Sequence, residues 1–202
     1  MRLKIVYFIF LCLLLSSCVS VNDEIRNPLN QDEFIRDAVY DLRIIKTDET
    51  SIYESKKENS CKLIIYIEGS GLNSVLGERK NGIWRSFQFS YYVYNFFKDK
   101  CNIIIPEKLK MRVGENYESD KETVSLYTVE NMFESYRKSV DFYLDEHDFS
   151  TVILFGVSEG GLLIPKIYDS LKNREKISKI VVWGSGGLSQ YECFKILGNT
   201  KI

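Results

Sequence analysis

The sequence contains a single histidine, His147, among 202 residues, and its five cysteines include no pair at the short spacing of metal ligands. A protein zinc site normally needs three or four such residues. We therefore expect no metal site. The stretch GSGLNS (69–74) lacks the glycine or alanine that closes a dinucleotide-binding fingerprint, so we expect no nucleotide cofactor either.

An excess of charge of one sign is also missing. The formal net charge is −1, from 27 basic and 28 acidic residues, which argues against nucleic acid as a partner. The sequence has no internal repeat and no low-complexity tract, which excludes solenoid and fibrous architectures. With 45% hydrophobic residues, the chain suffices for one globular domain with a single core.

The first residues have the pattern of an export signal. Two positive charges, Arg2 and Lys4, precede an apolar run of eleven residues (5–15), which is too short to span a bilayer but suits a signal-peptide core. The next residues, LSSC, end at Cys18 and resemble the lipobox of bacterial lipoproteins. The resemblance implies cleavage before Cys18 and acylation of that cysteine. An uncleaved N-terminal anchor is the alternative.

These features divide the chain into a lipoprotein signal peptide at 1–17, a polar tether at 18–33 and one folded domain at 34–202. Under either alternative the domain is exported and held at a bacterial cell membrane or outer membrane. Each buried methylene of an acyl chain contributes about 0.8 kcal/mol, so several chains hold a protein firmly. The membrane, reached through the N-terminal lipid, is therefore the first predicted partner.

Continuous apolar runs predict the elements of this domain. Short runs at 63–67, 102–105, 151–155 and 180–183 predict buried strands, because each stops at glycine or proline. Helices are expected at 83–99, from the N-cap Thr128 onward and at 161–171, and two further strands around the turn 47–50; residues 107–127 are expected to form a polar surface loop. Strands alternating with helices predict an α/β fold whose mostly parallel sheet has crossover helices.

The stretch VILFGVSEGG (152–161) places Ser158 on a turn from a strand to a helix, between Gly156 and Gly160. Side chains at the two glycines would collide with neighbouring backbone. This pattern resembles the nucleophile elbow of the α/β-hydrolase family. The resemblance implies that Ser158 is the nucleophile and that residues 34–202 form an α/β-hydrolase-like domain. The alternative is a serine that only caps the following helix.

The resemblance also implies an oxyanion hole, in which two backbone N–H groups face the oxygen that gains charge. One belongs to the residue after the nucleophile, Glu159. The other belongs to the loop in YIEGSG (66–71), with Ser70 first and Gly71 next. Glu68 occupies the place where the family often has a histidine. The alternative for this loop is an ordinary turn at the end of a strand.

Two cysteines precede predicted strands: Cys61 comes before 63–67, and Cys101 before 102–105. If these strands are neighbours, the thiols can bridge, and an exported protein can keep such a bond. The alternative is two buried free thiols. The strand order of the α/β-hydrolase family makes these strands neighbours and therefore favours the disulfide.

The family's catalytic triad follows the order serine, acid, histidine. His147 precedes Ser158, and the strand 151–155 separates them by about 17 Å. Only 44 residues follow Ser158, and a strand-helix-strand unit alone takes about 30. Glu192 is the sole candidate acid after the last predicted strand. We therefore expect a C-terminally incomplete fold that resembles the family over about 40–190.

Two functions follow. The first is a membrane-anchored serine hydrolase that acts on an ester, thioester or amide through Ser158 and is impaired or inactive as a 202-residue chain. The second is a surface lipoprotein that binds a small molecule or protein without turnover. A shortened gene product, a natural non-catalytic relative and a partner chain that completes the site all explain the missing histidine. A partner would bind at the exposed edge of the strand 180–183.

Overall fold

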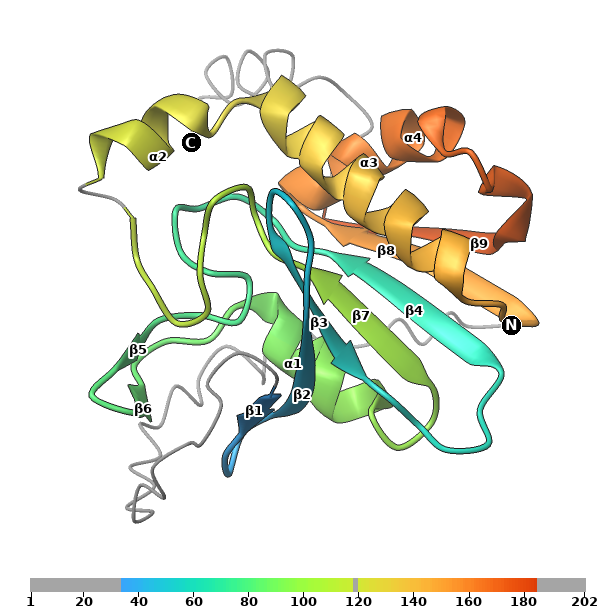
Figure 1. The fold of residues 1–202 in the computed structure, drawn as a ribbon, viewed down its shortest axis with the longest axis horizontal. Helices are drawn as coiled ribbons and strands as arrows, with labels where there is room; N and C mark the ends of the chain where they lie inside the picture. Colours follow the sequence, from blue (N-terminus) through green and yellow to red (C-terminus); the bar gives the residue numbers. More distant parts are fainter. Residues whose placement is uncertain (1–33, 118–119, 185–202) are drawn as a thin grey trace, which may run out of the picture.

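The computed structural model describes residues 34–117 and 120–184. They form one seven-stranded sheet, a two-stranded hairpin and four α-helices within the described part of the chain (Figure 1). The elements are β1 (Phe34–Arg36), β2 (Asp41–Lys46), β3 (Ser51–Ser55), β4 (Lys62–Ile67), β5 (Arg79–Lys80), β6 (Ile83–Trp84), α1 (Phe89–Phe97), β7 (Asn102–Pro106), α2 (Lys121–Leu126), α3 (Val129–Glu146), β8 (Thr151–Val157), α4 (Glu159–Ser170), a short 3-10 helix (Arg174–Lys176) and β9 (Ile177–Trp183).

The strand order in the large sheet is β1-β2-β3-β7-β4-β8-β9. The strands β7, β4, β8 and β9 are parallel to one another, whereas β1, β2, β3 and β7 pair antiparallel in succession. Because β2 is reversed twice relative to β7, it runs in the same direction as the parallel group. Only β1 and β3 oppose it, so the expected α/β fold with a mostly parallel sheet is confirmed.

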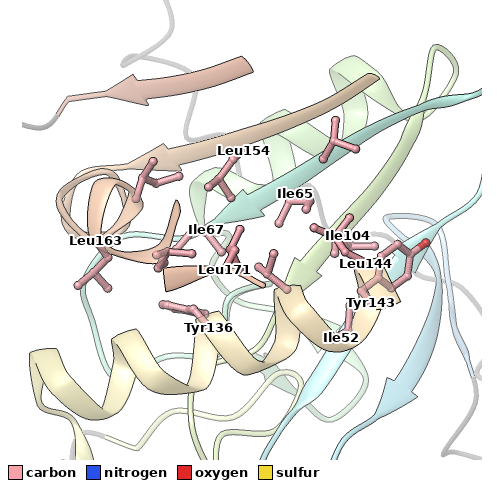
Figure 2. Close-up of a cluster of buried hydrophobic side chains, with 14 of the residues drawn as sticks. Ile52, Ile65, Ile67, Ile104, Tyr136, Tyr143, Leu144, Leu154, Leu163 and Leu171 are labelled. Atoms are coloured by element: carbon pink, nitrogen blue, oxygen red, sulfur yellow. The ribbon is translucent and has the colours of Figure 1, made fainter. Parts of the chain in front are cut away.

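Helices cover both faces of this sheet. Figure 1 shows α1 behind the strands and α3 in front of them. Side chains alternate along β4, so Leu63, Ile65 and Ile67 face α3 and α4, while Ile64 and Tyr66 face α1. Figure 2 shows the first of these two cores, where Leu154 and Ile65 of the sheet meet Leu163 and Tyr136 of the helices. Burial on both faces explains why these strands are continuously apolar.

The predicted start of α3 is confirmed. The Oγ1 of Thr128 accepts a hydrogen bond from the N–H of Asn131 at 3.2 Å. This bond satisfies one of the N–H groups that the first turn of a helix leaves without an acceptor. The expected turn at 47–50 is also present, since the N–H of Thr47 donates to the carbonyl of Thr50 at 2.9 Å.

Two expectations are confirmed only in part. The helix expected at 83–99 is present as α1 (Phe89–Phe97), but Ile83 and Trp84 form β6, because Asn81 and Gly82 adopt positive φ values of 52° and 79° and turn β5 back into β6. The segment 107–127 is not a surface loop throughout. Its first residues, Glu107 and Lys108, are fully buried at 0% exposure, and it contains α2.

The possible disulfide between Cys61 and Cys101 is not formed; both thiols are free, as in the alternative, although only Cys101 is buried. The strands that follow them are neighbours, as the family resemblance implied, but Leu63 aligns with Asn102. This register puts Lys62, not Cys61, beside Cys101. Cys61 is exposed, whereas Cys101 is buried. The Sγ of Cys61 instead accepts from Ser150 at 2.9 Å.

Several expectations lie outside the described residues: the signal peptide at 1–17, the lipidated Cys18, the tether at 18–33 and the acid candidate Glu192. The strand β9 lies at one side of the described sheet, and its last four residues are each at least 40% exposed. A partner at this edge remains a prediction. Within 34–117 and 120–184, no helix is both long and apolar enough to cross a membrane.

Candidate active site

Ser158 occupies the turn between β8 and α4, where its side chain is exposed. Its φ of 52° and ψ of −120° form a conformation that residues with a side chain rarely adopt. Such a conformation costs about 1–3 kcal/mol and persists only where surrounding contacts impose it. One such contact is the hydrogen bond from the Ser158 N–H to the carbonyl of Trp183, 2.8 Å long, which ties the turn to the end of β9.

The two glycines around Ser158 are required by space. A Cβ on Gly160 would lie 2.4 Å from the carbonyl oxygen of Glu68 and 2.5 Å from that of Ile67. A Cβ on Gly156 would lie 2.7 Å from the carbonyl oxygen of Gly160. All of these neighbours are backbone atoms, which cannot move aside cheaply. The absence of side chains therefore lets α4 start directly against β4 and β8.

The loop after β4 lies against the serine. A Cβ on Gly69 would lie 3.2 Å from the Cβ of Ser158, so only a glycine fits comfortably between them. Ser70 and Gly71 follow, and both are exposed. Within the described residues the N–H of Ser70 has no hydrogen-bond acceptor. The structure therefore brings together the two segments from which the oxyanion donors were predicted.

Glu159 contributes from the other segment. Its N–H belongs to the first turn of α4, where main-chain N–H groups have no acceptor inside the helix. Its carboxylate accepts a hydrogen bond from the hydroxyl of Tyr127, at 2.8 Å. Burial, followed by the nearby charge of Glu159, raises the pKa of Tyr127, so this phenol remains a donor. The contact connects the end of α2 to the serine turn.

Glu68 binds the start of the loop after β4, and it occupies the place where the family resemblance implies a histidine. It is 3% exposed, and its carboxylate accepts from the N–H of Gly69 at 2.7 Å, the N–H of Ser90 at 2.9 Å and the hydroxyl of Tyr66 at 3.1 Å. Ser90 is in the first turn of α1, where a carboxylate is favoured. Burial raises the pKa of Glu68, although these donors lower it.

Glu107 and Lys108 form hydrogen bonds with residues 71–75 of the same loop. The Glu107 carboxylate accepts from Ser74 Oγ at 2.6 Å, from the N–H of Val75 at 2.9 Å and from the hydroxyl of Tyr53 at 2.8 Å. The Nζ of Lys108 donates to the carbonyls of Gly71 and Asn73. Both residues come directly after β7, so three adjacent strands, β7, β4 and β8, end in segments of one site.

His147 is far from this site, as expected. It caps the C-terminus of α3, its Nδ1 lies 3.0 Å from the carbonyl of Tyr143, and its ring stacks on that tyrosine at 4.3 Å. The seven residues of β8 separate it from Ser158, a span of about 23 Å. His147 therefore has a structural role near the start of β8, at the opposite end of that strand from Ser158.

Possible metal ligands and surface hollows can be compared with the position of the site. In the described part of the chain, no group of three His, Cys, Asp or Glu side chains is arranged to hold a metal ion. Two surface hollows of about 280 and 530 Å³ are lined by residues at the opposite ends of the strands, such as Cys61 and Arg43. The chemical groups that the described residues bring to the site are Ser158 and the surrounding main-chain and charged groups.

Glu107, Lys108 and Tyr127 were not predicted from the sequence as residues of the site. A signal for the first two was present, because a charged pair directly follows the apolar strand 102–105 and its proline. In α/β folds, functional groups gather where parallel strands end. Tyr127 has no such signal, since its contact with Glu159 spans 32 residues of sequence.

No protein-family model and no curated protein matches the chain. Solved structures of α/β-hydrolase fold proteins match it. They include a lipase-esterase related protein from Clostridium acetobutylicum (16% identity, 75% of this chain and 54% of that one, TM-score 0.45), MenH from S. aureus (12%, 75% and 47%, 0.46) and an α/β hydrolase from Novosphingobium aromaticivorans (16%, 79% and 46%, 0.47). The chain spans about half the length of these structures, and at such identities the likeness concerns the fold alone.

Proposed function

We propose that this protein is a serine hydrolase-like lipoprotein whose Ser158 attacks an ester, thioester or amide carbonyl. One observation carries the proposal: Ser158 is exposed in a strained turn, against a loop that ends the neighbouring strand. Strained positions of this kind cluster at functional sites. The N–H groups of Ser70 and Glu159 would stabilise the oxyanion of the tetrahedral intermediate.

In the proposed reaction, Ser158 Oγ bonds to the carbonyl carbon and the leaving group departs with a proton. Water then cleaves the acyl-enzyme. A serine needs a base to accept its proton, and the chain has one histidine, placed at the opposite edge of the sheet. We therefore propose that acylation by this chain is slow, and that turnover is impaired unless another group supplies the base.

The same observation favours a second candidate function, in which the site binds a ligand or a protein partner without turnover. The N–H groups near Ser158 would still bind an anionic or carbonyl oxygen, because hydrogen bonding does not need the missing base. Slow acylation separates the two candidates, since a pure binding protein has no reactive serine.

We also propose that the protein is attached to a bacterial membrane through lipid on Cys18. The support is the sequence pattern described above, a short apolar run followed by LSSC. Metabolic labelling with a palmitate analogue tests it: we expect label in the wild-type protein and none in Cys18→Ala. Label that survives this substitution would contradict the proposal.

A fluorophosphonate probe tests the proposed nucleophile, because it reacts covalently with activated serines. We expect time-dependent labelling of the folded wild-type protein, no labelling of Ser158→Ala, and unchanged labelling of Ser170→Ala, a matched serine at the exposed end of α4. Heat-unfolded wild-type protein should not react. A folded wild-type sample that stays unlabelled would leave the binding function as the better account.

A further inference from the structure

The side chain of Lys108 carries an ammonium group and yet is 0% exposed. Removing such a charge from water costs several kcal/mol unless neighbouring groups compensate for the lost hydration. Lys108 follows β7, at the edge of the sheet where β4 and β8 also end. The groups that replace water around the Lys108 ammonium therefore belong to the candidate site.

These groups are mainly carbonyls of the loop after β4. The Nζ of Lys108 donates to the carbonyl oxygen of Gly71 at 2.6 Å and to that of Asn73 at 3.2 Å, and lies 5.8 Å from the ring centre of Tyr127. Burial lowers the pKa of Lys108, while the charges of Glu107, Glu68 and Glu159 raise it. The ammonium thus binds the loop directly and interacts with the carboxylates around it.

The loop is consequently held at two points, with Ser70 between them. Glu68 binds the N–H of Gly69 at 2.7 Å, and Lys108 binds the carbonyl of Gly71 at 2.6 Å. Gly71 has a φ of 112°, which turns its peptide groups away from an ordinary extended path. Bonds on both sides of Ser70 restrict the directions that the Ser70 N–H can take.

We propose that Lys108 is the positioning residue of the loop 69–73 and holds the Ser70 N–H toward the oxyanion formed at Ser158. This inference rests on the proposed function of Ser158. Lys108 acts through the loop, because its buried Nζ is bonded to main-chain carbonyls and is not available to a substrate.

The test compares Lys108→Met, which has a similar length but no charge or donor, with Lys176→Met. Lys176 serves as a control, because its partly exposed Nζ also donates to two main-chain carbonyls, those of Leu144 and His147, besides the carboxylate of Asp148, near the opposite ends of the strands. Hydrogen exchange of backbone amides and the kinetics of fluorophosphonate labelling are measured on both variants and on the wild-type protein.

For Lys108→Met we expect faster amide exchange within 69–75, by about tenfold, with α3 protected as in the wild-type protein. The maximal labelling rate should fall about 100-fold, as for a misplaced reacting group, while the probe concentration for half-maximal rate stays unchanged. Lys176→Met should change neither the loop nor the labelling. If Lys108→Met does not fold, Lys108→Leu, which also lacks the donor and the charge, takes its place with the same expectations.

Unchanged exchange within 69–75, or a loss of protection spread equally over α3, would overturn the role of Lys108. A labelling defect seen only as weaker probe binding would also overturn it. The exchange result does not depend on reactivity. An unlabelled wild-type protein whose loop loosens only in Lys108→Met would therefore contradict the proposed reaction while supporting Lys108 as the residue that orders the loop.

Discussion

Ser158 combines exposure with a main-chain conformation that favours glycine. A serine that only capped α4 would accept a hydrogen bond from the first turn of the helix, but its side chain makes no cap bond. At the scale of one residue, strain is thus retained where a hydroxyl is presented to solvent beside Gly69. This combination is the main support for the proposed reactive role of Ser158.

Replacement of Ser158 by glycine should stabilise the protein relative to Ser158→Ala. Relief of the strained φ contributes about 1–3 kcal/mol. The greater freedom of glycine in the unfolded chain offsets up to about 1 kcal/mol of that gain. We expect a net difference of about 1 kcal/mol in the free energy of unfolding in urea. A less stable glycine variant would show that the turn at 158 is not strained.

At the scale of elements, the site depends on how closely α4 approaches β4. The helix begins at Glu159, and a Cβ on Gly160 would collide with the carbonyl oxygens of Ile67, the last residue of β4, and of Glu68. The contact sets the distance between the serine turn and the loop after β4. Helix α1 contributes to the same loop, because Glu68 accepts the N–H of Ser90 in its first turn.

Gly160→Ala should therefore push α4 away from β4. Overpacking of this kind costs about 1–3 kcal/mol, and backbone neighbours make the upper end of the range the expected value. Fluorophosphonate labelling should decrease as well. Ser170→Ala, at the exposed end of the same helix, should change stability by less than about 0.5 kcal/mol. Equal unfolding midpoints for the two variants would rule out the close approach.

The elements that the sequence predicts well are those whose signal is local. The buried strands and the serine turn follow from continuous apolar runs that end in glycine or proline. The segments 83–99 and 107–127 were predicted only in part, because the structure of their first residues depends on distant partners. The indole N–H of Trp84 donates to Asp37, 47 residues away, and Glu107 accepts from Tyr53, 54 residues away.

The same limit applies to the site. Ser158, Ser70 and Glu159 were predicted from a motif and its family resemblance, and the structure places their segments side by side. The buried charges that support them, Glu68 and Lys108 in particular, have partners that no short pattern reveals. The possible disulfide could not be judged from the sequence for a related reason, because it depends on how β4 and β7 align, to within one residue.

At the scale of the whole molecule, the strand order explains why the site exists. The strands β7, β4 and β8 are adjacent and parallel, so the segments that follow them meet at one edge of the sheet. Those segments contain Lys108, Ser70 and Ser158. The same segments bury three ionisable side chains, those of Glu68, Glu107 and Lys108. Because these groups are removed from water, the stability of the fold should depend on pH.

Glu68→Gln should reveal this sensitivity. Burial raises the pKa of Glu68 above its ordinary value of 4.5, so the folded protein binds this proton more tightly than the unfolded chain does. The resulting stability is fully present below pH 4.5 and is lost as the pH rises through the raised value. Urea unfolding across this window should show the wild-type protein losing stability relative to Glu68→Gln. A relative gain with rising pH would mean that the donors around Glu68 dominate.

The central claim is that Ser158 is a nucleophile presented at the edge of the sheet. Peptide mass mapping of the folded protein after fluorophosphonate treatment tests it most directly. We predict one phosphonyl adduct, on the peptide that contains Ser158, and an unmodified Ser70. An adduct on a different serine, or a folded protein without any adduct, would contradict the claim.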